Sequence, residues 1–121
     1  MQSAAQAYGT VAKQTAAPRE LEANLLLRAA SRLQAVSDAW DTRERDLDGA
    51  LLYNRKLWSI FLSSVTSGDN ELPAGVRQNV ANLGLFVINH TLSMAADRRP
   101  EKLGSLIAIN RELAAGLLGR A

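Results

Sequence analysis

The amino-acid sequence predicts an all-α fold, an antiparallel four-helix bundle with a short N-terminal helix, formed by a single domain over residues 1–121. Apolar residues make up 47% of the chain, and many of them are Ala and Leu, which are strong helix formers. They recur at spacings of three and four, the period of a helix with one buried face. Strict alternation with β-branched residues, the pattern of a strand, does not persist anywhere.

Each of the three prolines stands just before a segment with helical periodicity. Proline is tolerated there because the first N–H of a helix has no intrahelical partner. A short helix is predicted ahead of them over residues 3–14, with Ala4, Tyr8 and Val11 on one side. The second predicted helix covers residues 18–40. Its expected apolar face consists of Leu21, Leu25, Ala29, Leu33, Val36 and Trp40.

Three more helices are predicted over residues 46–66, 73–97 and 100–118. A charged stretch before the first of these forms either a loop or a helical turn, and the composition of residues 67–70 predicts a turn. Short connections make successive helices antiparallel neighbours. The apolar face of the third helix is expected to contain Leu47, Leu51, Trp58, Phe61, Leu62 and Val65.

The fourth predicted helix is apolar on two sides. Its core-facing stripe contains Val76, Val80, Leu83, Val87 and Met94. A second stripe, roughly opposite, contains Ala81, Leu85, Ile88 and Leu92, and Phe86 lies apart from both. Either the short N-terminal helix covers the second stripe, since a helix that is apolar all round is usually central, or part of it accepts a partner helix in a groove.

Two Asn-Arg dipeptides, at residues 54–55 and 110–111, lie within helical patterns. On a helical wheel, Asn54 and Asn110 fall inside the apolar stripes, where a polar amide costs free energy unless it is hydrogen-bonded. They are therefore interpreted as core amides that bond to each other or to backbone and fix the helix register. The alternative is that they meet the backbone of a bound peptide. Arg55 and Arg111, one position on, are expected at the surface.

The composition argues against several classes of function. The chain has no Cys, one His (His90) and no Gly-rich phosphate loop, so neither an enzyme nor a cofactor or metal site is expected. No apolar stretch is long enough to span a membrane and no signal peptide is apparent, which favours the cytoplasm. With 14 basic and 12 acidic residues, nucleic-acid binding is not favoured; Tyr53, Arg55 and Lys56 are the weak candidate surface for RNA.

The chain resembles the alphaproteobacterial flagellar biosynthesis regulators of the FlaF family. The resemblance covers essentially the whole chain and depends on the order and spacing of several segments together. These are Ala7-Tyr8, residues 17–23 (APRELEA), residues 51–61 (LLYNRKLWSIF), residues 72–77 with Asn79, residues 85–87 (LFV) and residues 106–117 (LIAINRELAAGL).

The resemblance implies a small cytoplasmic protein needed for flagellin production and filament assembly. It implies action together with a second regulator, FlbT, which represses flagellin synthesis after transcription. It further implies direct binding of flagellin, as an export chaperone or as a sensor of unexported flagellin. The terminal segments of flagellin are amphipathic helices once ordered, so a hydrophobic groove would suit them.

The resulting hypothesis is a protein-binding module that holds flagellin in the cytoplasm and promotes its synthesis and secretion. The candidate partner-binding residues are Leu85, Phe86, Ile88, Leu92, Tyr53, Arg55 and Arg111. One alternative is a post-transcriptional regulator that acts on flagellin mRNA, directly or through FlbT. Another is a structural subunit that works only in a complex with FlbT.

Overall fold

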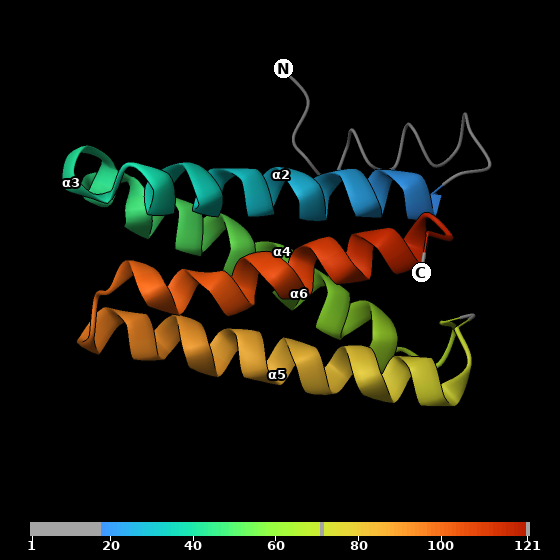
Figure 1. The fold of residues 1–121 in the computed structure, drawn as a ribbon. Coiled ribbons are helices and arrows are strands. Elements are labelled where there is room, and N and C mark those ends of the chain that lie inside the picture. Colours follow the sequence, from blue (N-terminus) through green and yellow to red (C-terminus); the bar gives the residue numbers. More distant parts are fainter. Residues whose placement is uncertain (1–17, 71, 121) are drawn as a thin grey trace, which may run out of the picture.

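A computed structural model describes residues 18–70 and 72–120 of the chain, and these residues form an all-α bundle of four long helices (Figure 1). The predicted fold class is confirmed for this part of the chain. The short N-terminal helix expected over residues 3–14 lies outside the described residues. The long helices are α2 (Pro18–Asp38), α4 (Leu47–Thr66), α5 (Ala74–Ala96) and α6 (Leu103–Leu117). The short elements are α3 (Trp40–Arg43), η1 (Glu44–Asp46) and η2 (Pro100–Lys102), the last two being 3₁₀ turns.

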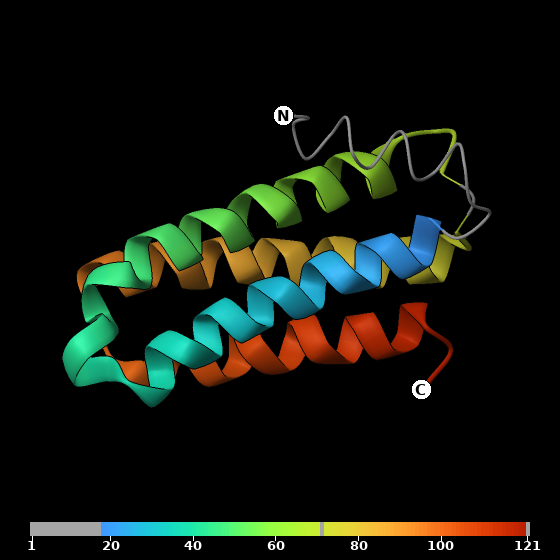
Figure 2. The same cartoon turned by 90° about the horizontal axis from the view of Figure 1, so that it is seen from above.

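The four long helices pack as two close pairs. The chain runs α2, α4, α5, α6, but the closest pairs are α2 with α6 and α4 with α5, and α2 also contacts α4. Seen from above, the pairs lie side by side (Figure 2). Helix α5 therefore has one main neighbour, α4, and keeps much of its surface free.

The helix ends differ from the expected ones by a few residues because short turns occupy them. Helix α2 ends at Asp38, and Trp40 starts α3, where the backbone N–H of Thr42 and of Arg43 both donate to the carbonyl of Ala39. The charged stretch thus continues as helical turns into α4. Pro100 opens a 3₁₀ turn ahead of α6, a common arrangement at helix ends.

The buried core draws on all four helices. In α4 it includes Trp58, whose ring meets that of Phe61 edge-on at 5.7 Å between centroids. In α2 the buried face is centred on Leu26 and Leu33, and Leu25 is only partly buried against it. The expectation that Val76 faces the core is wrong: its side chain is 44% exposed, because it lies in the first turn of α5, one turn before Val80 enters the core.

Two buried amides connect three helices in the middle of the bundle. Asn54 of α4 and Asn110 of α6 are both fully buried. The indole Nε1–H of Trp58 donates to Asn110 Oδ1 at 2.8 Å. Asn110 Nδ2 donates to Asn54 Oδ1 at 2.7 Å and to the Leu26 carbonyl of α2 at 3.5 Å. Because buried polar groups are costly without partners, this network favours one relative placement of α2, α4 and α6. That Asn54 and Asn110 fix the register of these helices stays a prediction.

Candidate partner-binding surface

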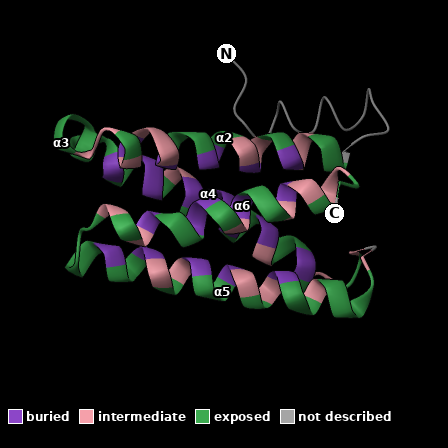
Figure 3. Cartoon of the chain, viewed as in Figure 1, coloured by how far each residue is buried: buried purple, intermediate pink, exposed green. Residues whose placement is uncertain are grey.

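Helix α5 exposes large apolar side chains along its outer side. Leu85 is 57% exposed and Leu92 is 59% exposed, while Ile88 between them is half-buried. Positions 85, 88 and 92 follow the i, i+3, i+7 spacing, so they share one helix face. Figure 3 shows that much of α5 is exposed or of intermediate burial. We call Ala81, Leu85, Ile88 and Leu92 the outer stripe.

The rotation of α5 that leaves the outer stripe exposed follows from a narrow buried face against α4. Its buried residues recur at Val80, Gly84, Val87, Thr91 and Met94. A Cβ atom at Gly84 would lie 2.6 Å from Cδ2 of Leu62 in α4. Glycine at this position therefore lets the two helices approach closely.

Replacing Gly84 with valine is expected to lower the free energy of unfolding by roughly 1–3 kcal/mol, because the added side chain overlaps Leu62 and overpacks the interface. Urea unfolding followed by circular dichroism measures the effect. Gly116→Val is the matched control, since a Cβ there meets nothing within 4 Å. Equal unfolding midpoints for the two variants would contradict a close α4–α5 contact at Gly84.

Arg55 of α4 flanks the outer stripe. Arg55 and Leu62 are seven residues apart and so share a helix face, and Leu62 packs against Gly84 of α5. The antiparallel register given by this contact places Arg55 level with Thr91, the residue before Leu92. The Arg55 side chain is exposed. The apolar outer stripe thus lies beside an exposed cation.

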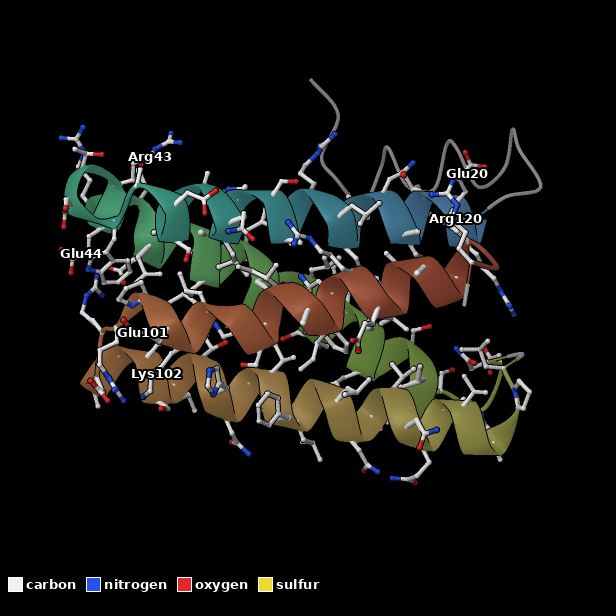
Figure 4. The ribbon with its side chains drawn as sticks, viewed as in Figure 1. Glu20, Arg43, Glu44, Glu101, Lys102 and Arg120 are labelled. Carbon is white, nitrogen blue, oxygen red and sulfur yellow. The ribbon has the colours of Figure 1, made fainter. Side chains whose placement is uncertain are left out.

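An ion-pair cluster holds the end of α5 against the start of α4. Arg98 donates to Asp48 at 2.8 Å and to Glu44 at 3.1 Å, and hydrogen bonds to Asp48 first and Glu44 second raise the pKa of Arg98. Glu44 lies at the same end of the bundle as Glu101 and Lys102 (Figure 4). These groups are largely exposed, so their stabilisation is small, but they support the same antiparallel register.

Phe86 lies on the other flank of α5. Its ring stacks on His90 with 5.2 Å between centroids. His90 Nε2 lies 2.7 Å from the carbonyl of Lys102 and 3.3 Å from the hydroxyl of Ser105. Phe86 thus belongs to the α6 side of α5, whereas Arg55 marks the α4 side.

The structure does not gather all seven predicted partner residues at one place. Leu85, Ile88, Leu92 and Arg55 share the outer α4–α5 surface. The Tyr53 ring instead faces α2, with the Arg32 guanidinium 4.9 Å from its centroid. The expected surface of Tyr53, Arg55 and Lys56 is therefore split.

Arg111 is also separate from the outer stripe. It is exposed on α6, where it lines a shallow pocket of about 340 Å³ between α2 and α6. Asn54 and Asn110 lie in the core network and not at the surface.

Sequence reasoning missed two exposed apolar residues of α4. Leu52 is 40% exposed and Ile60 is 63% exposed. Helical periodicity predicts this exposure, because both residues fall outside the spacing at which the buried residues of α4 recur. A pocket of about 530 Å³ at the end of the bundle where α2 begins and α6 ends had no such signal, since residues of four helices line it, among them Glu22, Phe61, Val80 and Leu117.

Comparison with known proteins gives one family. The family model described as "Flagellar protein FlaF" matches residues 4–117 of the chain. No curated protein and no solved structure matches the chain significantly. Within residues 18–70 and 72–120, every helix is too short or too polar to cross a membrane.

Proposed function

The chain belongs to the FlaF family of flagellar proteins, and from this premise we propose that it binds flagellin in the cytoplasm as a chaperone and regulator. Bound flagellin would be kept from polymerising and made available for secretion, and its synthesis would be promoted. In this proposal the protein acts by binding flagellin and catalyses no reaction.

The exposure of Leu85 and Leu92 on the outer stripe is the observation that carries this proposal. Contiguous exposed apolar side chains on a small protein favour an interaction site. An amphipathic helix places its apolar residues at i, i+3 and i+7, the same spacing as Leu85, Ile88 and Leu92. Such a helix could lie along the α4–α5 surface with an acidic residue near Arg55.

Isothermal titration calorimetry with purified flagellin tests the proposal. We expect binding with a dissociation constant of roughly 10 μM or tighter and a negative heat-capacity change, because apolar surface is buried. Flagellin lacking its terminal segments is the control and should give no heat of binding. If intact flagellin also gives none at concentrations of about 100 μM, the proposed chaperone role is wrong.

Direct action on flagellin mRNA has less support at the site predicted for it. Tyr53 packs under Arg32 and lies on a different flank of α4 from Arg55. A gel shift with flagellin leader RNA, compared with Arg55→Ala plus Lys56→Ala, would detect binding there. Co-purification with FlbT would detect action through that partner.

A further inference from the structure

A second surface, distinct from the outer stripe, concentrates arginine. A groove of about 580 Å³ lies between α2 and the η1–α4 segment. Arg28 and Arg32 line it from α2, and Arg43 and Arg45 line it from the turn. Arg43, the last residue of α3, is labelled in Figure 4. The groove contains a single carboxylate, that of Asp46.

Most of the positive charge in this groove is uncompensated. Asp46 pairs with Arg43 at 3.3 Å. Glu44 and Asp48, the acidic residues on either side of Asp46, pair with Arg98 instead. Within the part of the chain that the structure describes, Arg28, Arg32 and Arg45 have no carboxylate within ion-pair distance. Three guanidinium groups are thus left to bind an external anion.

The groove is partly organised before any ligand binds. The Arg32 guanidinium lies over the Tyr53 ring, and its Nη2 is 3.6 Å from where a Cβ of Gly49 would lie. Arg28 and Arg32 are four residues apart on α2 and therefore adjacent on its surface. Holding a long side chain in place before binding reduces the entropy lost on binding.

The floor of the groove is apolar. Ala35, Val36 and Ala50 line it, and Val36 and Ala50 are buried. These small side chains leave room for an apolar side chain of a ligand between the arginines. Rim cations over an apolar floor match a peptide that alternates carboxylates with apolar residues.

We propose that this arginine groove binds an acidic, amphipathic segment of a partner protein. A nucleic-acid backbone fits less well, because the groove has no aromatic lining on which bases could stack. Arg32 already covers Tyr53, the nearby aromatic residue. The net charge of +2 also gives weak attraction for a polyanion. The groove lies on the α2 side of α4 and the outer stripe on the α5 side, so both surfaces can be occupied together.

Fluorescence anisotropy of the full chain with a fluorescein-labelled Glu-Leu-Glu-Ala repeat peptide tests this inference. We expect salt-sensitive binding that weakens roughly tenfold on Arg28→Gln plus Arg45→Gln. This pair leaves the Arg32–Tyr53 contact in place, so the fold should be retained, which circular dichroism checks. A Gln-Leu-Gln-Ala repeat peptide should not bind.

Arg19→Gln plus Arg120→Gln is the matched control, since it removes the same charge from exposed sites outside both the groove and the outer stripe. The control pair should leave the peptide affinity within about twofold of the parent protein. Equal weakening by both pairs would overturn the inference, because binding would then follow net charge alone. Tighter binding of polyuridylate RNA, lost on Arg28→Gln plus Arg45→Gln, would assign the groove to nucleic acid instead. The peptide contains no flagellin sequence, so its result is independent of the flagellin titration.

Discussion

Replacing Asn110 with leucine is expected to lower the free energy of unfolding by roughly 3–5 kcal/mol. The change leaves the buried Trp58 Nε1–H without its acceptor and Asn54 Oδ1 without its donor. Each buried polar group that loses its partner costs about 1–3 kcal/mol. Leucine has the γ-branched shape of asparagine but a larger side chain, so overpacking adds to the loss from the polar groups. Urea unfolding followed by circular dichroism and tryptophan fluorescence measures it.

Asn54→Leu is the informative comparison. Asn54 Nδ2 has no hydrogen-bond partner among the described residues. Removing this side chain therefore eliminates one unpaired group, and it leaves Asn110 Nδ2 with only its longer hydrogen bond to the Leu26 carbonyl. We expect a loss of roughly 1–2 kcal/mol. A triple variant, Asn54→Leu, Asn110→Leu and Trp58→Phe, removes all the polar side-chain groups at once and should recover part of the stability.

These variants also separate stability from register. If the amides fix the relative placement of α2, α4 and α6, the triple variant should unfold with a lower m-value or show broadened amide NMR signals even where its stability recovers. A loss below about 1 kcal/mol for Asn110→Leu would contradict the importance of the network.

The helices and the buried amides follow from local sequence patterns. Pro18 begins α2, Pro73 precedes the first residue of α5 and Pro100 begins the turn before α6, as expected because a helix tolerates proline in its first turn and not in its interior. Asn54 and Asn110 lie in the apolar stripes on a helical wheel, and both are buried. Hydrophobic periodicity predicts such features because they depend only on residues within one helix.

Features that depend on neighbouring helices were less predictable. Tyr53 and Arg55 are two residues apart, so they lie on different flanks of α4, and the positions of α2 and α5 decide what each flank meets. The arginine groove combines Arg28 with Arg45, which are brought together by the turn through α3 and η1. In the sequence these arginines are scattered, so the groove could not be recognised there.

The outer stripe shows the same limit. A helical wheel places Ala81, Leu85, Ile88 and Leu92 on one side of α5. It carries no information on whether another helix covers them. The close contact of Gly84 with Leu62 sets the rotation of α5, so that Ile88 is partly covered while Leu85 and Leu92 face outward. Gly84 carries no signal of this role in the sequence pattern.

Replacing both Leu85 and Leu92 with aspartate is expected to weaken flagellin binding roughly hundredfold or more. Central apolar residues of an interface often contribute about 2 kcal/mol each, and a charge in a buried interface adds a desolvation cost. Both side chains are more than half exposed in the free protein, so the fold should be retained. Calorimetric titration with flagellin measures the affinity, and urea unfolding measures the stability of the same samples.

Ile60→Asp is the matched control, because Ile60 is 63% exposed on α4 and lies away from the face that Arg55 and Leu62 share. This variant also replaces an exposed apolar residue with a charge, and it should change the affinity for flagellin by less than about threefold. If Ile60→Asp weakens binding as much as the Leu85 and Leu92 pair, flagellin does not bind through the outer stripe. If the pair instead lowers the unfolding midpoint strongly while binding persists, the stripe contributes to the core. Loss of affinity with unchanged stability, seen for the pair alone, is the result that places the helix of the partner along α5.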